Sequence, residues 1–528
     1  MSRRKVFRRI VSALIVAAIL LVNAVSHAEI YTAEGSYVMS EVENLQVARE
    51  RAKANAMRYA CEQAGVYVKS YSRMKNFKLE EDVIETMTAN ILKLVEEPYF
   101  YPLEEVANMG GVLIRVTVKA QVDDSDINHW LSKDEQQKSD LVAQNEALRK
   151  ANAEQERQIA ELKRQLAANP HDKERITQKF ADEDKIFLSN QKVEEAWKRY
   201  NKGDYNGAIS LHSEALELNP SNEQAWWGRG TAYNELKQNE QAIQDYNKAI
   251  QLNPNSSEAY NNRGIAYSAL GQKERAIQDY NKALQLNPNN AEAYNNRGNA
   301  YSALGQKERA IQDYNKALEL KPNYSAAYNN RGNAYQDLNQ YKRAIQDFDK
   351  AIQLNPNLSE AYSNRGNAYF RLGQKERAIQ DYDKAIQLNP NNAEAYNNRG
   401  NAYFRLGQNE QAIQDYDKAI QLKPNDAEVY NNRGIAYFRL GQNEQAIQNY
   451  DKAIQLNPNN ARLYFVRGLA YGGLNNAKSF FADINKAIEL DPNFAAAYQI
   501  RGLVYQALGD EAKAQADFAK AKKLGYKD

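Results

Sequence analysis

Apolar residues in the second part of the chain follow a pattern that repeats every 34 residues. In the copy at residues 393–426 they are spaced three and four apart in two runs, which predicts two amphipathic helices. Gly407 and Gln408 separate the two runs, and Pro424 ends the second. The apolar positions of this copy are Ala395, Tyr396, Ala402, Tyr403, Ala412, Ile413, Tyr416, Ala419, Ile420 and Leu422. One such helix pair cannot bury its apolar face alone, so we expect neighbouring copies to stack.

Ten copies of this unit align from Ser189 to Asp528. Nine of them carry a proline at the same position, namely Pro220, Pro254, Pro288, Pro322, Pro356, Pro390, Pro424, Pro458 and Pro492. A fixed period of this length is the sequence signature of a solenoid. The predicted fold class is therefore mainly α, with an α–α superhelix as its largest part.

A glycine lies in the middle of the first predicted helix in nine copies: Gly230, Gly264, Gly298, Gly332, Gly366, Gly400, Gly434, Gly468 and Gly502. Glycine inside a helix costs roughly 1 kcal/mol relative to alanine. A cost kept in nine copies predicts the close approach of a neighbouring helix. Ala412 and its equivalents offer the matching small residue on the second helix.

The array strongly resembles the tetratricopeptide repeat (TPR), whose diagnostic positions are matched by Tyr396, Gly400, Tyr403, Ala412, Tyr416, Ala419 and Pro424. Two copies depart from the pattern. The first has Ala196 for the glycine and His212 for the aromatic residue, and the ninth has Phe480 and Ile484 at the alanine and aromatic positions. Copies at or near array ends are commonly atypical. Arg399 and its equivalents replace the family's usual leucine, and no sequence pattern explains this.

The resemblance implies that the first helix of each pair lines a concave groove, where a ladder of asparagines holds an extended peptide by its backbone. The matching residues are Asn262, Asn296, Asn330, Asn364, Asn398 and Asn432, and one turn further on Asn299, Asn333, Asn367 and Asn401. An asparagine amide can donate to a carbonyl and accept from an N–H together. The alternative is that these are consensus residues bound to water or to neighbouring helices.

Phe370, Phe404 and Phe438 occupy one position in three successive copies, each followed by an arginine: Arg371, Arg405 and Arg439. They predict an aromatic strip with a basic edge, suited to apolar side chains of an acidic-flanked ligand. The alternative is that the phenylalanines fill the seam between adjacent copies.

The chaperone-adaptor form of this family grips a C-terminal carboxylate with lysine and arginine. Here the corresponding places hold Asn261, Asn295 and Asn329, with Glu258, Glu292, Glu360, Glu394 and Glu428 nearby. Repulsion between a carboxylate and these glutamates argues against such a clamp.

Residues 29–125 predict a small α+β domain. Val112, Ile114, Val116, Val118 and Val122 alternate with Leu113, Arg115, Thr117, Lys119 and Gln121, which is typical of a half-buried strand. Residues 66–69 predict a shorter strand. A helix is predicted from about residue 45 to 64, ended by Gly65, and a second over 79–95. Alanines at every fourth position form a smooth stripe that lets a sheet approach closely: Ala48, Ala52, Ala56, Ala60 and Ala64.

The sequence AEGSYV, the alanine stripe and the closing strand IRVTVKAQV together resemble a small envelope domain. That domain is found at the start of flagellar assembly protein T and in LPP20-type lipoproteins. The resemblance implies an exported location and an assembly or anchoring role. It brings no catalytic residues with it.

Residues 126–168 predict a coiled-coil helix. One heptad position holds Leu141, Leu148, Gln155 and Leu162, and the other holds Asn145, Asn152, Ile159 and Leu166. This pattern favours a short parallel coiled coil and hence a homodimer, because asparagines paired across two strands fix their register. A single solvated helix that acts as a spacer is the alternative. Asn169 and Pro170 end the helix, and residues 169–188 are predicted to form a linker.

Residues 1–28 are typical of a secretory signal peptide. Arginines and a lysine precede an uncharged apolar run from Ile10 to Val25, and Ser26-His27-Ala28 forms a small-x-small cleavage site. The alternative is an uncleaved anchor, which would bring membrane contact. The apolar run is shorter than the ~20 residues that a spanning helix needs. We therefore expect an exported protein of the periplasm or cell envelope.

The composition excludes several functional classes. Lysine plus arginine (69) nearly balances aspartate plus glutamate (67), so there is no electrostatic footprint for nucleic acid. Cys61 is the only cysteine, and the four histidines form no ligand pair. No catalytic or cofactor motif is present, so we expect neither an enzyme nor a cofactor.

The sequence thus predicts a non-enzymatic scaffold that binds a protein or peptide partner in the repeat groove. The alternative is a structural envelope protein that associates with itself and has no dedicated groove ligand.

Overall fold

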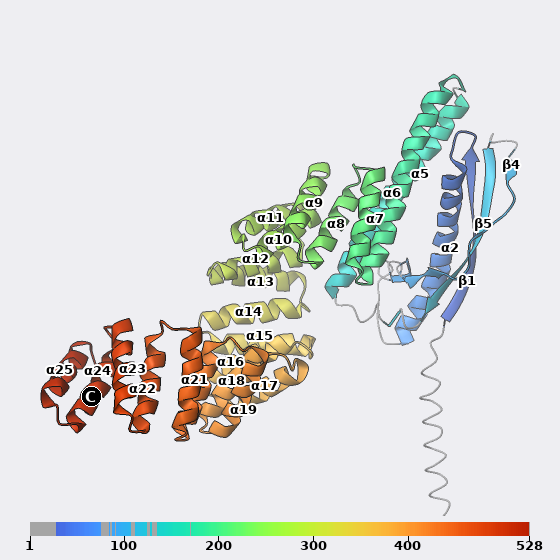
Figure 1. Cartoon of the computed structure of the whole chain (residues 1–528). Helices are drawn as coiled ribbons and strands as arrows, with labels where there is room; N and C mark the ends of the chain where they lie inside the picture. Colours follow the sequence, from blue (N-terminus) through green and yellow to red (C-terminus); the bar gives the residue numbers. More distant parts are fainter. Residues whose placement is uncertain are drawn as a thin grey trace, which may run out of the picture. The chain divides into compact units, whose positions relative to one another are not determined.

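The computed structural model describes residues 28–74, 84, 87–89, 91–106, 111–123, 127–128, 135–168 and 170–526. The predicted signal peptide, apart from its last residue, and most of the predicted helix at 79–95 lie outside these ranges. The chain is mainly helical and forms two units, residues 1–270 and 271–528 (Figure 1). No helix in the described ranges is long and apolar enough to cross a membrane.

The N-terminal domain is a five-stranded antiparallel sheet covered by one long helix, α2 (Leu45–Met74). Strand β1 (Ala28–Ser40) pairs with β5 (Gly111–Asp123) along its whole length. The short strands at the other edge of β5 are β2 (Lys93–Leu94), β3 (Tyr99–Phe100) and β4 (Glu104–Val106). The predicted strand over 112–122 is confirmed, because Ile114, Val116 and Val118 are buried whereas Arg115 and Lys119 are exposed.

The alanine stripe of α2 faces this sheet. All five predicted alanines are fully buried, so the side chains leave room for close approach. The shorter strand predicted at 66–69 is wrong, since α2 runs through Gly65 to Met74. Val68 continues the four-residue stripe and is fully buried, and its packing outweighs both the helix cost of glycine and the β propensity of valine. The predicted end of the next helix at Val95 is also wrong, because Lys93 and Leu94 pair with β5.

Gly35 of β1 lies where α2 comes closest. A Cβ atom added there would lie 2.6 Å from the Ala52 carbonyl oxygen and closer still to the Ala56 nitrogen. Both are backbone atoms, so neither can move aside alone. We expect Gly35→Ala to destabilise the domain by about 2–3 kcal/mol, measured by urea unfolding. Gly65→Ala is the matched control, because among the described residues its Cβ would meet only Thr88 Oγ1, at 3.9 Å, and it should stabilise by about 1 kcal/mol. Equal effects of the two changes would contradict this account.

The helices that follow the domain form a hairpin. Helix α5 (Glu135–Ala168) is joined by the turn η1 (Pro170–Asp172) to α6 (Lys173–Asn201), and the two pack against each other. Most of the predicted linker at 169–188 is therefore helical. Its apolar residues Ile176 and Phe180 were not recognised as a helical pair, although they are four apart.

The later part of the predicted coiled-coil seam packs within the chain. Ile159 and Leu162 are buried against Ile176 and Phe180 of α6, and the Gln155 amide donates to the Glu183 carbonyl at 2.8 Å. Asn152 is exposed. The side chains of Leu141, Asn145 and Leu148 are among those that the structure does not describe. The homodimer stays a prediction.

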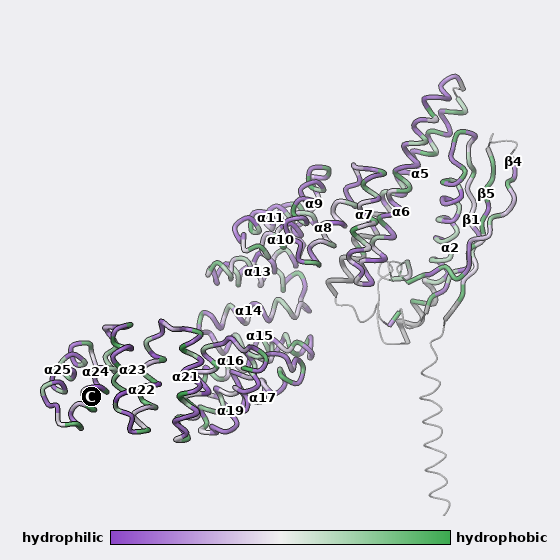
Figure 2. The backbone as a smooth tube through the Cα atoms, viewed as in Figure 1, coloured by the Kyte–Doolittle hydropathy of each residue, from purple (hydrophilic) through white to green (hydrophobic). Residues whose placement is uncertain are grey.

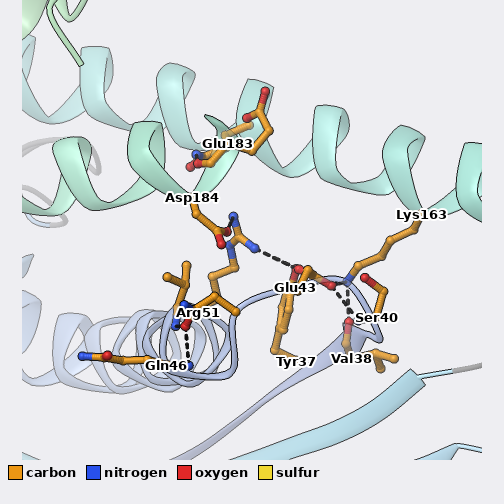
Figure 3. A network of polar contacts seen from close by, with 12 residues as sticks. Tyr37, Val38, Ser40, Glu43, Gln46, Arg51, Lys163, Glu183 and Asp184 are labelled. Atoms are coloured by element: carbon orange, nitrogen blue, oxygen red, sulfur yellow. Dashed lines mark hydrogen bonds and ion pairs between the residues drawn. The ribbon is translucent and has the colours of Figure 1, made fainter. Parts of the chain in front are cut away.

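A buried polar network fixes the small domain to this hairpin (Figure 3). Arg51 of α2 pairs with Glu43 at 2.9 Å and with Asp184 of α6 at 3.0 Å. Lys163 of α5 donates to the Val38 carbonyl and lies 3.5 Å from Glu43. Burial raises the pKa of Asp184, although the positive charge of Arg51 acts to lower it. Because α6 continues into the first repeat, one helix links the domain to the array.

The array is a run of helix pairs in which hydrophilic and hydrophobic stretches alternate along the chain (Figure 2). The first helices after α6 are α8 (Glu223–Glu235), α10 (Ser257–Ala269), α12 (Ala291–Ala303), α14 (Ser325–Asp337), α16 (Ser359–Arg371), α18 (Ala393–Arg405), α20 (Ala427–Arg439), α22 (Ala461–Gly473) and α24 (Ala495–Ala507). The second helices are α7 (Tyr205–Leu218), α9 (Asn239–Leu252), α11 (Lys273–Leu286), α13 (Lys307–Leu320), α15 (Tyr341–Leu354), α17 (Lys375–Leu388), α19 (Asn409–Leu422), α21 (Asn443–Leu456), α23 (Ala477–Leu490) and α25 (Glu511–Lys523). The predicted helix pairs are confirmed.

The mid-helix glycines are explained by contact within each pair. A Cβ atom on Gly400 would lie 2.8 Å from the Tyr416 ring and 3.2 Å from the Ala412 carbonyl oxygen. The predicted close approach is confirmed. The closest neighbour is the ring of Tyr416, while Ala412 contributes its backbone.

The arginine that replaces the family's leucine joins three helices. Arg399 on α18 makes a two-pronged bond to Asp415 on α19, with N–O distances of 2.8 and 2.6 Å. Its third nitrogen, Nη1, reaches Asp383 on α17 of the preceding repeat at 2.6 Å. Asp415 is only 5% exposed, so a leucine at 399 would leave a buried carboxylate without its partner. Equivalent buried pairs in the second unit are Arg297–Asp313, Arg331–Asp347, Arg365–Asp381, Arg467–Asp483 and Arg501–Asp517.

The first repeat has a different core. His212 is fully buried beside Trp197, with the ring centroids 5.3 Å apart. Neither of its ring nitrogens has a hydrogen-bond partner in the described chain. Burial, aided by the positive charge of Arg229, lowers the pKa of His212 to about 3. The histidine is therefore held neutral in the native state.

Candidate functional site

A groove lies in the second unit. It has a volume of about 890 Å³ and extends over five successive first helices, from Gln336 on α14 to Leu463 on α22. Six of the thirteen predicted binding residues line it: Asn367, Asn398, Asn401, Asn432, Phe370 and Phe404. The other seven, Asn262, Asn296, Asn299, Asn330, Asn333, Asn364 and Phe438, do not. The repeat period thus identified the lining positions but not which copies form the groove.

The groove asparagines bond to one another between repeats. The amide nitrogen of Asn398 donates to the amide oxygen of Asn367 at 3.0 Å, and Asn432 donates to Asn401 at 3.3 Å. The same oxygen of Asn367 accepts from the Tyr382 hydroxyl at 2.8 Å. These bonds fix the amides in place. Since an amide nitrogen carries two hydrogens, Asn398 keeps a second donor for a ligand.

Several asparagines outside the groove make similar bonds. Asn330 and Asn364 donate to Asn295 and Asn329 of the preceding repeats at 3.0 and 3.1 Å. In the first unit, Asn262 accepts from Asn261 at 3.3 Å. Bonding to neighbouring helices, the alternative interpretation of the ladder, is therefore present. Ligand contact stays a prediction.

Phe370 and Phe404 each pack between repeats and also line the groove. Phe370 contacts a core formed by Ala378 and Tyr382 of its own repeat and Ala402 of the next. Phe404 packs beside Tyr416, and the guanidinium of Arg439 lies 4.9 Å from its ring centre. Both side chains fill a seam between repeats and leave part of their surface in the groove. Phe438 packs against Ala446 and Tyr450 of its own repeat and Ala470 of the following one, and it does not line the groove.

The polar groove residues that the sequence analysis missed include Gln336 and Asn431. The amide oxygens of Gln336 and Asn431 are buried, and neither has a partner within the described residues. Both side chains line the groove. Asn431 could have been found, because it immediately precedes the ladder residue Asn432. Gln336 gives no such signal, since serine or phenylalanine occupies its position in neighbouring copies.

The described part of the chain contains no group of three or more histidine, cysteine, aspartate or glutamate residues arranged to hold a metal ion. The groove offers amides, aromatic faces and separate charges instead. This donor set suits non-covalent recognition of a polypeptide.

Family models match the chain without a gap from residue 230 to 516. The model described as "TPR repeat" matches 230–271, 366–407, 400–441 and 436–475. Models described as "Tetratricopeptide repeat" match 257–290, 291–324, 325–358, 348–380, 461–494 and 484–516. Together these matches cover more than half of the chain. It belongs to the tetratricopeptide repeat family.

Several solved structures are similar to parts of this TPR protein. YrrB, described as a TPR protein with an unusual peptide-binding site, is 29% identical over 34% of this chain and 94% of its own, with a TM-score of 0.31. A TPR protein from Parabacteroides merdae is 25% identical over 47% and 98%, with a TM-score of 0.40. MamA is 30% identical over 30% and 94%, with a TM-score of 0.29. No curated protein matches the chain.

Proposed function

We propose that this TPR protein is a non-enzymatic scaffold of the bacterial cell envelope that holds an extended segment of a protein partner in its groove. The observation that carries the proposal is the cavity of about 890 Å³ lined by Asn398 and Phe404 on α18 and by Asn432 on α20. Amides held in register can bond to a peptide backbone, and the exposed aromatic surface can take an apolar side chain.

The location follows from the N-terminal segment. A cleavable signal peptide would export the chain to the periplasm or cell envelope, and an uncleaved one would hold it at a membrane. The sheet domain, fixed to α6 by Arg51 and Asp184, would then anchor the array or set its position. A homodimer formed through α5 would present two grooves on one particle.

The proposal predicts that groove amides matter for capture and that equivalent amides elsewhere do not. The full-length protein and two double variants serve as bait in envelope extract. Asn398→Ala with Asn432→Ala removes two groove amides, and we expect about a tenfold loss of the retained partner. The matched control, Asn330→Ala with Asn364→Ala, removes two amides that bridge repeats outside the groove. Equal retention by all three proteins, or capture of this chain alone, would favour a self-associating structural protein instead.

A further inference from the structure

Two rows of opposite charge border the groove. Glutamates lie in the first turn of three successive helices, α16, α18 and α20, and arginines end the same helices. The acidic row is Glu360, Glu394 and Glu428, and the basic row is Arg371, Arg405 and Arg439. Two residues of each row line the cavity itself: Glu394, Glu428, Arg371 and Arg405. All six side chains are exposed.

These six charges are not neutralised by ion pairs within the described part of the chain. No ion pair among the described residues involves any of the six, whereas the arginines at the middle of the same helices are all paired. In the basic row, the Arg439 guanidinium lies against the Phe404 ring. The two rows are separated by eleven residues of helix, or about 16 Å at 1.5 Å per residue. Asparagine amides and phenylalanine rings lie between them.

Stabilisation of the helix dipole explains part of this pattern, since acids favour helix starts and bases favour helix ends. It does not explain where the arginines occur. Helices α10 and α12 also begin with a glutamate but end with Ala269 and Ala303. The arginines appear only in the three repeats that also carry the phenylalanines. The acidic row ends where Arg462 takes the glutamate position.

We propose that the groove selects an extended zwitterionic segment, with acidic side chains directed to the arginine row and basic side chains to the glutamate row. The inference rests on the proposed function and names the chemistry of its ligand. Successive side chains of an extended peptide point to opposite sides, so a segment with alternating charge meets both rows at once. Its backbone carbonyls can accept from the amide nitrogen of Asn398, which lines the groove and keeps a second hydrogen.

The test uses full-length protein and two labelled peptides of equal composition. One repeats Glu-Lys six times and so carries its acids and bases on opposite sides. The other repeats Glu-Glu-Lys-Lys three times, which places both signs on each side. Several exposed ion pairs together should make the alternating peptide bind about tenfold more tightly at low salt. Added salt should remove the difference, because exposed charges are screened.

Charge reversal tests the rows directly. Replacing Arg371, Arg405 and Arg439 with glutamate makes both edges acidic and should abolish the preference. Exchanging both rows, so that Glu360, Glu394 and Glu428 also become arginine, should restore it. Circular dichroism checks that each variant keeps its helices.

Equal affinity of the two peptides, or no binding of either, would overturn the zwitterionic proposal. The proposed function would still stand if the groove-amide variants lose partner capture. If that capture is also unaffected, the groove itself is not the binding site.

Discussion

Replacing Asp415 with alanine is expected to destabilise its repeat by about 3 kcal/mol. The substitution leaves the Arg399 guanidinium partly buried without its main partner, and removing one member of a buried pair is strongly unfavourable. Burial raises the pKa of Asp415, although the positive charge of Arg399 acts to lower it. Stability in a repeat array is local, so the measurement is hydrogen exchange of the α18 and α19 amides.

The other partner of the same arginine provides the control. Asp383 also bonds to Arg399 but its side chain is 52% exposed, so Asp383→Ala should cost less than about 1 kcal/mol. The double variant Arg399→Leu with Asp415→Leu should recover most of the loss, because an apolar pair can replace a buried ion pair. The account is wrong if both single aspartate changes cost the same or if the double variant is the least stable.

The first repeat is expected to lose stability in acid through His212. Above pH 6.5 the histidine is neutral in both states and its titration contributes nothing. Below that value the unfolded chain binds a proton, while the native state, with the pKa of His212 lowered to about 3, does not. The free energy of unfolding should therefore fall by about 1.4 kcal/mol per pH unit between pH 6.5 and 3, up to about 5 kcal/mol in total.

His212→Phe should remove this slope. Phenylalanine is tolerated at the equivalent position of the fifth repeat, where Phe348 is fully buried. Hydrogen exchange of α7 at pH 7, 5 and 4 would measure the effect, with the exposed His171 changed to glutamine as the control. Parallel pH profiles for the wild type and His212→Phe would rule out the histidine as the source of acid sensitivity. The test compares the slopes of stability against pH. The absolute stabilities are not compared, because the larger phenylalanine ring changes the packing at every pH.

Local patterns were enough to predict most of the array. The helix pairs follow from spacing within 34 residues, and each mid-helix glycine signals a close helix even without knowledge of its partner. The aspartate partner of Arg399 was not predicted, because it lies 16 residues away on another helix and the pairing depends on how two helices face each other. The sequence also did not predict which copies line the groove, since equivalent asparagines in different copies look identical in sequence.

Ahead of the repeats, tertiary contacts overrode local signals. Gly65 and the β-branched residues after it suggested a helix end and a strand, yet burial of Val68 against the sheet keeps α2 helical. The break at Asn169 and Pro170 predicts a linker, yet α6 begins at Lys173. Ile176 and Phe180 are enough to pack α6 on α5. The heptad seam of α5 was predicted to pack against a second copy of the chain, but part of it packs against α6 of the same chain.

The part of the groove formed by α16, α18 and α20 is the proposed binding site of the partner. Hydrogen exchange of the full-length protein, with and without its captured partner, tests this most directly. We expect partner-dependent protection at the asparagine-bearing turns of these three helices and little change in α10 and α12. Protection confined to the N-terminal sheet, or to the second helices of the pairs, would contradict the account.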